Sequence, residues 1–192
     1  MLSISSNVFN ETVINKSRFI TFLFRVDSLD DIKKYVDDLI LKYKDCTHIC
    51  YAFILDNVKR FSDDGEPGGT AGMPILNVLE NKNLNHVLCC VVRYFGGIKL
   101  GANGLVRAYS NSCSSVINKA NIILLVPGKL CSINFKYDDT KAIDKLLSNC
   151  DIINKNYGDF VSYLFKADLD FIDKLSNYDF KIIEDCYIEK EH

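Results

Sequence analysis

The chain has 192 residues, of which 48% are hydrophobic and 25% are charged, and its formal net charge at pH 7 is −2. These are ordinary values for a globular protein, so they exclude a disordered or fibrous chain, and the length allows one domain or two small ones. The N-terminal residues lack the pattern of a secretory signal, and no apolar run reaches the ~18 residues that a membrane-spanning helix needs. We therefore expect a soluble protein of the cytoplasm with no membrane partner.

Strands and helices alternate along the first part of the chain. Four strands are predicted from apolar and aromatic runs, over residues 18–26, 47–55, 86–95 and 122–126. The third of these is apolar on both faces and is therefore expected at the centre of a sheet. Three helices are predicted: one over residues 28–43 with Ser28 as its N-cap, a short one with Pro74 at its first position, and one from about Asn103.

The pair Pro127–Gly128 predicts a boundary between two domains, at residues 1–126 and 129–192. After it, the predicted order is strand, helix, strand, strand, helix and strand, over residues 130–137, 140–148, 151–155, 160–166, 169–176 and 180–188. This βαββαβ order is the ferredoxin-like arrangement. The predicted fold class is therefore α+β.

The eight cysteines form no C-x-x-C pair, and without an export signal we expect reduced thiols. Cys46, His48 and Cys50 alternate onto one face of a predicted strand, but the two cysteines would lie ~13 Å apart at ~3.3 Å per residue, too far for one zinc ion. His48 is therefore interpreted as a structural residue, and no serine–histidine–aspartate set is visible. We expect no metal centre and no cofactor, apart from the Mg²⁺ considered below.

Glycine is concentrated in two short segments. Eight of the ten glycines lie between Gly65 and Gly104, in "SDDGEPGGTAG" and in "RYFGGIKLGANGLVR". The second segment is basic, since no Asp or Glu occurs between Asn81 and Tyr137, whereas seven Lys and Arg residues do. A strand, a glycine-rich loop and a helix in this order present backbone N–H groups to an anion.

Three cations, Arg93, Lys99 and Arg107, are placed to converge on an anion at this loop, and Tyr94 could stack on a nucleic-acid base. As strand neighbours, Tyr94 and Phe95 point to opposite faces, so at most one of them faces a ligand. The Walker A and dinucleotide-binding glycine patterns are both missing, so this is not an ordinary nucleotide-binding loop. The sequence predicts anion binding here, with a purely conformational role of the glycines as the alternative.

The first glycine-rich segment is acidic, with Asp63, Asp64 and Glu66 close together. Carboxylates grouped in this way can bind Mg²⁺, which takes one or two protein carboxylates together with water and phosphate. Alternatively, they cap turns and pair with Arg93 or Arg107. The sequence alone leaves both interpretations open.

Taken together, "SDDGEPGGTAGMPIL" and "VVRYFGGIKLGANGLVRAY" resemble the signature of the YigZ/IMPACT family, and the upstream "KSRFI" and "HICYAF" also match it. By position, the signature falls on Asp63, Asp64, Gly65, Glu66, Pro67, Thr70, Ala71 and Gly72, and on Arg93, Tyr94, Phe95, Gly96, Gly97, Lys99, Leu100, Gly101, Gly104, Leu105 and Arg107. This chain departs from the pattern at Asn103, where the family usually has glycine. Asparagine tolerates positive φ and caps helices, so the backbone shape can be kept.

The resemblance implies a two-domain α/β protein of the bacterial type. Its first domain is expected to be a βα sandwich similar to a small-subunit ribosomal protein domain and to domain IV of the translocating elongation factor. Its second domain is expected to be similar to the ferredoxin-like last domain of that factor. The resemblance also implies a link to translation, because the eukaryotic branch of the family regulates it and RNA or ribosome binding is proposed for the bacterial branch.

The leading hypothesis is a non-enzymatic protein that binds structured RNA or the ribosome and acts in translation or its regulation. Two alternatives stay open: a Mg²⁺-dependent enzyme acting on a phosphorylated small molecule, and a module that binds only a protein partner. No catalytic residue is assigned. The candidate binding residues are Asp63, Asp64, Glu66, Arg93, Tyr94, Gly96, Gly97, Lys99, Gly101, Asn103, Gly104 and Arg107.

Overall fold

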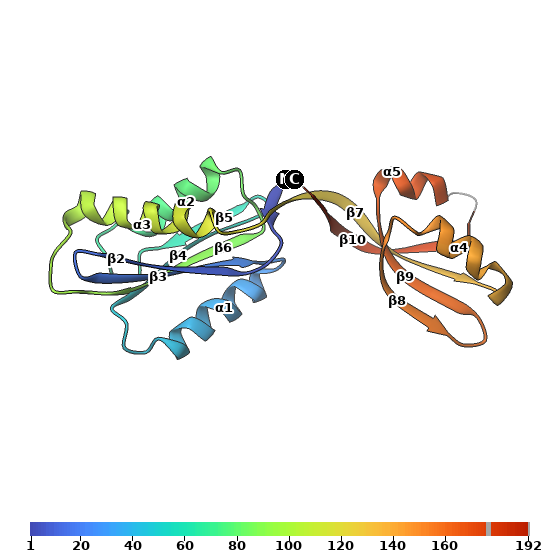
Figure 1. Cartoon of the computed structure of the whole chain (residues 1–192), viewed down its shortest axis with the longest axis horizontal. Helices are drawn as coiled ribbons and strands as arrows, with labels where there is room; N and C mark the ends of the chain where they lie inside the picture. Colours follow the sequence, from blue (N-terminus) through green and yellow to red (C-terminus); the bar gives the residue numbers. More distant parts are fainter. Residues whose placement is uncertain (176–177, 192) are drawn as a thin grey trace. The chain divides into compact units, whose positions relative to one another are not determined.

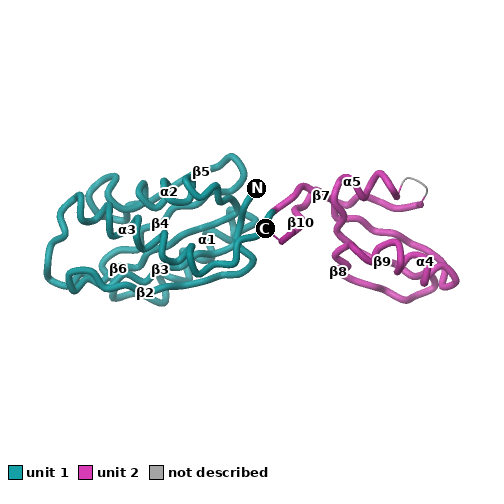
Figure 2. The backbone as a smooth tube through the Cα atoms, turned by 45° about the horizontal axis from the view of Figure 1, so that its top comes forward, with its two compact units in different colours: residues 1–124, 192 teal, residues 125–191 magenta. Residues whose placement is uncertain are grey.

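The structure is a computed structural model that describes residues 1–175 and 178–191. The backbone forms two compact units, Met1–Leu124 and Leu125–Glu191, which Figure 2 colours separately. Each unit has hydrophobic clusters of its own, so each is described by itself. The domains predicted at residues 1–126 and 129–192 stay a prediction, because compactness alone does not show that a segment folds independently.

The sheet of the first unit has the strand order β2-β3-β6-β4-β5, and neighbouring strands pair antiparallel. Its strands are β2 (Val8–Ile14), β3 (Ser17–Arg25), β4 (His48–Leu55), β5 (Val58–Ser62) and β6 (Val87–Tyr94). The central place of β6 is as predicted, and its residues are buried on both faces. The sequence patterns do not predict the edge strands β2 and β5, because exposed positions interrupt or dominate both and leave little apolar signal.

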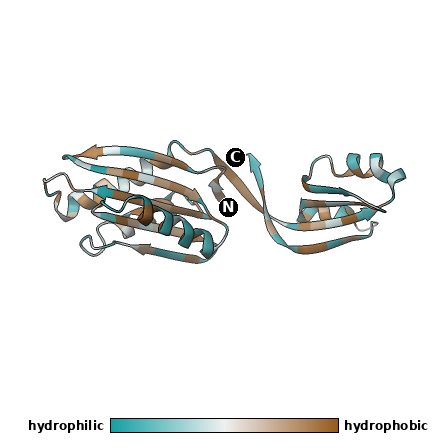
Figure 3. Cartoon of the chain, turned by 90° about the horizontal axis from the view of Figure 1, so that it is seen from below, coloured by the Kyte–Doolittle hydropathy of each residue, from teal (hydrophilic) through white to brown (hydrophobic). Residues whose placement is uncertain are grey.

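Three helices cover this sheet: α1 (Leu29–Lys42), α2 (Gly72–Asn81) and α3 (Gly101–Ile117). Figure 1 shows α2 and α3 on one face of the sheet and α1 on the other, and a hydrophobic cluster fills each interface. Hydrophobic residues accordingly run along the strands in Figure 3. Ser28 caps α1 as predicted, since its hydroxyl accepts a hydrogen bond from the N–H of Asp31 at 3.1 Å.

Two helices begin before their predicted positions. The second helix, α2, begins at Gly72, so Pro74 is its third residue rather than its first. Similarly, α3 begins at Gly101 rather than at about Asn103, and Gly101 has a φ of +71°. The start of a helix is predicted from capping residues next to it in the sequence. The start of α2 is capped instead by the side chain of Asp63, which lies eight residues before Ala71, so local residues do not mark it.

As far as the structure describes the chain, the second sheet has five strands: β7, β9 and β8 are neighbours in this order, and β10 and β1 (Leu2–Ile4) each pair with β7. The second unit holds this sheet except for β1 and the first residues of β7. Its elements are β7 (Ile122–Phe135), η1 (Tyr137–Asp139), α4 (Thr140–Leu146), β8 (Asp151–Tyr157), β9 (Val161–Asp168), α5 (Leu169–Ile172), η2 (Asp173–Leu175) and β10 (Phe180–Glu191). This is the predicted order of strands and helices. The helix predicted over residues 169–176 is split into α5 and η2, and its last residue, Ser176, lies outside the described residues.

Strand β7 is continuous through Pro127 and Gly128. The sequence predicts two strands separated there, and this prediction is wrong. The first residues of β7 pair with β1 (Leu2–Ile4), and the residues from Gly128 onward pair with β9, so Pro127 lies between these two sets of pairs. Gly128 serves close packing rather than a turn, because a Cβ there would lie 2.7 Å from the carbonyl oxygen of Ala167.

A buried histidine joins two connections of the first unit. His86 has a φ of +57°, and its Nδ1 and Nε2 atoms lie 3.2 Å and 3.0 Å from carboxylate oxygens of Asp27 and Asp56. Burial lowers the pKa of His86, but the hydrogen bonds with both carboxylates outweigh it and raise the pKa above 6.5. The hydrogen bond with His86 in turn lowers the pKa of Asp27 to about 2.

Within the part of the chain that the structure describes, no helix is long and apolar enough to cross a membrane.

Candidate functional site

Asp63 holds the loop that leads into α2. Its carboxylate accepts hydrogen bonds from the backbone N–H groups of Gly69 at 2.8 Å, Ala71 at 3.0 Å and Gly72 at 2.8 Å. Ala71 is the N-cap residue of α2 and offers no side-chain cap, so Asp63 supplies the acceptor and places a negative charge at the positive end of the helix. Asp63 therefore has a structural role, which is to cap α2 and to hold the loop before it.

Asp64 and His48 connect the acidic segment to the start of β4. Oδ2 of Asp64 accepts a hydrogen bond from the N–H of Ile49 at 2.6 Å, and the carbonyl oxygen of Asp64 lies 2.6 Å from Nδ1 of His48. Because a carbonyl oxygen only accepts, Nδ1 carries the proton, and in the neutral ring Nε2 carries a lone pair. Nε2 lies 4.0 Å from Oε2 of Glu66. No local sequence pattern reveals this orientation of His48.

Glu66 and Arg93 form a buried ion pair. Their side chains are 4% and 6% exposed, and Nη1 of Arg93 donates to Oε1 of Glu66 at 2.5 Å. The hydroxyl of Tyr109 donates to the same oxygen at 2.8 Å. Burial and the neighbouring Cys50 and Glu66 raise the pKa of Tyr109, so the phenol keeps the proton that it donates. Arg93 thus pairs with the acidic segment, through Glu66 and not through Asp63 or Asp64.

Aromatic rings and a hydroxyl complete the surroundings of Arg93. Its guanidinium carbon lies 5.5 Å from the ring centroid of Phe19 and 5.6 Å from that of Phe95, within the range of cation–π contacts. Nη2 lies 3.5 Å from the hydroxyl of Ser17. Nε is buried, and within residues 1–175 and 178–191 it has no hydrogen-bond partner. The guanidinium is therefore fixed in place while its Nε donor is left unused.

The basic loop is held against the turn between β2 and β3. The N–H of Gly96 donates to the hydroxyl of Ser17 at 3.2 Å. A Cβ on Gly96 would lie 2.0 Å from the carbonyl carbon and oxygen of Lys16, so no side chain fits there. Glycine at this position is required by the close approach of two backbone segments.

The two aromatic neighbours of the loop lie on opposite faces, as the sequence analysis expects. Tyr94 packs with the cluster under α1, and its hydroxyl donates to Asp45 at 2.9 Å. Phe95 is 46% exposed and lies beside Arg93 on the α3 side. The ring that is free to contact a ligand at the loop is thus Phe95, whereas the candidate residue was Tyr94.

Helix α3 begins with free N–H groups and cations nearby. The side chain of its N-cap residue, Leu100, accepts no hydrogen bond from the first turn, and this turn contains no acidic residue. Lys99 precedes the helix, while Asn103 and Arg107 are exposed and lie one turn apart. Among the described residues, neither Lys99 nor Arg107 has an ion-pair partner. Gly97 is exposed, and Gly104 packs near Leu100.

A pocket of about 440 Å³ lies between the acidic segment, the basic loop and the start of α3. We call it the α3 pocket, and its lining residues are Thr47, His48, Glu66, Pro67, Arg93, Phe95, Lys99, Leu100, Gly101, Ala102 and Leu105. Four candidate residues from the sequence, Glu66, Arg93, Lys99 and Gly101, line this pocket, and the other eight do not. The volume is in the range of about 300–1,000 Å³ that is usual for small-molecule sites.

Each of the three acidic side chains of the first glycine-rich segment is engaged in other contacts. The carboxylate of Asp63 accepts three backbone N–H groups, Asp64 accepts one, and Glu66 is paired with Arg93. Of the residues that the structure describes, no group of three His, Cys, Asp or Glu side chains is placed to hold a metal ion. The geometry therefore favours the interpretation of these carboxylates as caps and ion-pair partners.

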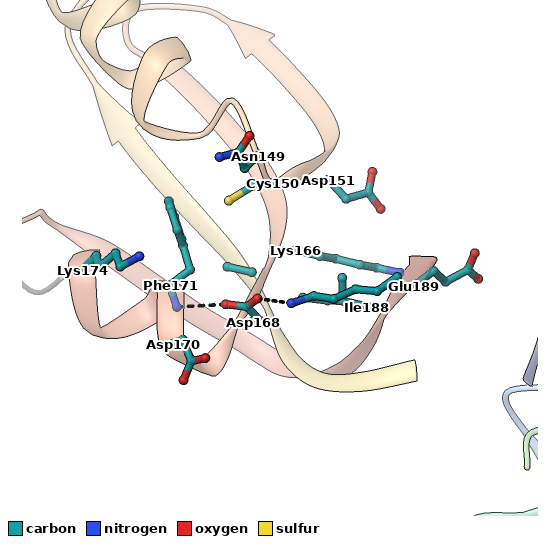
Figure 4. A pocket seen from close by; sticks show the side chains of 12 residues that line it. Asn149, Cys150, Asp151, Lys166, Asp168, Asp170, Phe171, Lys174, Ile188 and Glu189 are labelled. Carbon is teal, nitrogen blue, oxygen red and sulfur yellow. Dashed lines mark hydrogen bonds and ion pairs between the residues drawn. The ribbon is translucent and has the colours of Figure 1, made fainter. Parts of the chain in front are cut away.

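A second pocket of about 440 Å³ lies in the second unit, around the end of β9 (Figure 4). There, Asp168 accepts hydrogen bonds from the N–H of Phe171 at 2.9 Å and from Lys190 at 2.8 Å. Lysine and acidic side chains are nearly balanced around it. Burial raises the pKa of the Cys150 thiol in this pocket to about 11, so the thiol is protonated at neutral pH. This pocket offers neither an excess charge nor a ready nucleophile.

Comparisons with known proteins point to one family. Residues 15–117 match the model of the Impact N-terminal domain. IMPACT family member YigZ of Escherichia coli (strain K12) is 37% identical over 155 residues, which cover 77% of this chain and 76% of that protein. A crystal structure described as that of a hypothetical protein is 31% identical, with a TM-score of 0.67 over 99% of this chain and 98% of that chain.

IMPACT family member YvyE of Bacillus subtilis (strain 168) is 42% identical over 117 residues, which cover 59% of this chain but only 54% of that relative. The matched residues 15–117 include both glycine-rich segments and the whole lining of the α3 pocket. The pocket therefore lies in the part of the chain that carries the family likeness. On these matches, the chain belongs to the IMPACT family, and residues 15–117 are its Impact N-terminal domain.

Proposed function

We propose that this chain acts without catalysis in translation or its regulation, by binding structured RNA or the ribosome through the exposed side of α3 and the basic loop before it. The charge of this surface carries the proposal. No Asp or Glu occurs between Asn81 and Tyr137, and the exposed Lys99 and Arg107 have no ion-pair partner among the described residues. The other exposed residues of α3 are small, amide or apolar, so nothing on the helix repels phosphate.

The physical basis of such binding is the phosphate backbone. Phosphates are attracted by lysine and arginine and by the N–H groups at a helix start, and these contacts carry no sequence information. The free first turn of α3, Lys99 and Arg107 are contacts of this kind. The buried Arg93 is not, because Glu66 neutralises it.

We also propose the finer features that the family resemblance implies. The first unit would be related to the ribosomal protein domain and to domain IV of the elongation factor. The order β10-β7-β9-β8, together with the sequence strand, helix, strand, strand, helix, strand, supports a ferredoxin-like second unit. A cytoplasmic location and the domain limits 1–126 and 129–192 belong to the same proposal.

The proposal is tested by titrating the full chain with a fluorescent RNA hairpin at several salt concentrations and by co-sedimentation with ribosomes. Affinity is expected to fall as salt rises, since binding releases counterions. Arg107→Ala and Lys99→Ala are each expected to weaken binding and to reduce the slope of log K against log salt by about 0.9.

Lys33→Ala is the matched control, because Lys33 is an exposed lysine on α1, which covers the opposite face of the sheet. It is expected to leave both affinity and slope unchanged. Binding that is absent at low salt, or that responds equally to Lys33→Ala and Arg107→Ala, contradicts the proposal. Ribosome binding that ignores salt and Arg107 would instead indicate a protein partner.

A further inference from the structure

The proposed RNA surface does not account for the α3 pocket, which has an unusual combination of groups. Phe95, Leu100 and Leu105 provide apolar lining, whereas His48 and Glu66 provide hydrogen-bond acceptors. The first residues of α3 and Lys99 form another part of the lining. The pocket therefore offers an apolar surface, an acceptor pair and an anion-binding end together.

The acceptor pair consists of Nε2 of His48 and Oε2 of Glu66, because the other polar side-chain atom of each residue is already hydrogen-bonded. Nδ1 of His48 is committed to the carbonyl oxygen of Asp64, which leaves the Nε2 lone pair available. Oε1 of Glu66 is committed to Arg93 and Tyr109, which leaves Oε2 available. Nε2 of His48 and Oε2 of Glu66 lie 4.0 Å apart, and with the imidazole neutral both are acceptors within reach of the two N–H bonds of one amino group.

The other end of the pocket is suited to a phosphate. Gly101 and Ala102, the first two residues of α3, line it, and in the described part of the chain no side chain accepts a hydrogen bond from the N–H groups of this turn. Lys99 adds a positive charge at the same end. Arg93 also lines the pocket, but its guanidinium is paired with Glu66 and its Nε is buried, so the positive charge offered to a phosphate comes from Lys99.

We infer that the α3 pocket takes a single nucleotide with an amino-bearing base, either free or as an unpaired nucleotide of an RNA. The base stacks on Phe95, its amino group donates to His48 and Glu66, and its phosphate lies at the start of α3 beside Lys99. Uracil has a carbonyl oxygen in place of the amino group and a single N–H donor at N3 on this edge, so it leaves one of the two acceptors unpaired and is disfavoured. The RNA form of this inference rests on the function proposed above, whereas the free-nucleotide form does not.

The test uses the full chain and isothermal titration calorimetry with CMP and UMP, whose bases differ at the 4-position (amino against carbonyl) and at N3 (acceptor against N–H donor), and with ribose 5-phosphate. CMP is expected to bind at least about tenfold more tightly than UMP, and ribose 5-phosphate more weakly than CMP. Phe95→Ala is expected to weaken CMP binding about tenfold by removing the stacking surface. Equal affinity for CMP and UMP, or no binding of CMP, overturns the inference.

His48→Asn is the sharper variant. The asparagine amide can still donate to the carbonyl oxygen of Asp64, as Nδ1 does, but it removes the acceptor at the Nε2 position. The variant is expected to fold with an unchanged melting temperature and to lose most of the preference for CMP over UMP. A preserved preference in a folded variant overturns the assignment of the acceptor pair.

The RNA arm compares a hairpin with the same hairpin carrying one bulged cytidine or one bulged uridine. Tighter binding of the bulged cytidine that Phe95→Ala abolishes, with Arg107→Ala weakening all three RNAs alike, supports the RNA form. Salt-dependent binding of all three RNAs without any CMP selectivity overturns the nucleotide inference and leaves the proposed function standing. Selective CMP binding without any RNA binding supports a free-nucleotide site and overturns the proposed function.

Discussion

Replacing Asp63 tests whether the acidic segment is structural. The carboxylate accepts three backbone N–H groups at 2.8–3.0 Å, and two of them belong to the buried residues Ala71 and Gly72. Losing a helix cap alone costs about 0.5–2 kcal/mol, and leaving a buried N–H unpaired costs about 1–3 kcal/mol. For Asp63→Ala we expect a loss of about 3 kcal/mol in the free energy of unfolding.

Asp63→Asn separates charge from hydrogen bonding. Its side-chain oxygen can still accept from Ala71 and Gly72, but its amide nitrogen cannot accept from the N–H of Gly69. We expect a loss of about 1.5 kcal/mol, because one of three bonds and the charge at the helix start are removed. The control Asp37→Ala, at an exposed position of α1, is expected to change stability by less than about 0.5 kcal/mol.

The assay is urea denaturation followed by far-UV circular dichroism, with hydrogen exchange of the peptide that contains α2 as a local readout. Exchange of the α2 amides is expected to accelerate in the order wild type, Asp63→Asn, Asp63→Ala. The reasoning is refuted if Asp63→Ala costs less than about 0.5 kcal/mol or if both variants lose the same amount. A loss of RNA binding at unchanged stability would mean that Asp63 contacts the ligand.

Three further variants test other contacts. Glu66→Gln removes the counter-ion of the buried Arg93 and should lower the free energy of unfolding by about 3–5 kcal/mol, measured by the same denaturation; an unchanged midpoint would contradict the buried pair. The raised pKa of His86 makes a stabilising contribution that is complete below about pH 6.5 and is lost as the pH rises through the folded-state value. His86→Asn, which tolerates the positive φ, should abolish this part of the pH dependence between pH 6 and 8, and an unaltered profile would exclude the histidine as its source. Gly96→Ala should cost at least about 2 kcal/mol, whereas Gly68→Ala, where a Cβ meets open space, should cost about 0.5 kcal/mol or less; equal losses would argue against the close backbone approach.

Elements with a strong apolar pattern could be predicted from the sequence, and elements defined by their partners could not. The central strand β6 and the helices α1 and α3 have buried residues at the spacing that the rules require, and their predicted positions agree within a few residues. The edge strand β5 is almost wholly exposed, so only its pairing with β4 defines it. Pro127 and Gly128 predict a boundary that separates two strands, but β7 is continuous through them, and they are accommodated by the strands beside it.

In the candidate site, too, contacts between residues far apart in the chain could not be predicted from the sequence. Both glycine-rich segments contribute lining residues to the α3 pocket, so the sequence pattern indicates where this pocket lies, while its role in binding stays a prediction. The sequence also predicts that only one of Tyr94 and Phe95 faces this side, but period-two alternation does not say which. The acceptor role of His48 depends on a carbonyl group 16 positions away in the chain, and the cap on α2 comes from Asp63, so neither follows from local spacing.

The contact between the basic loop and the β2–β3 turn makes chain length, rather than side-chain chemistry, the stricter constraint on this region. The turn consists of Asn15 and Lys16, both at positive φ, and the following Ser17 bonds to Gly96, 79 positions further along the chain. One residue inserted in the turn would enlarge it or shift the register of β2 against β3, and would move Lys16 relative to Gly96. Insertions and deletions at residues 14–17 and 93–97 are therefore expected to disrupt the region beside the α3 pocket even where every side chain around the pocket is kept.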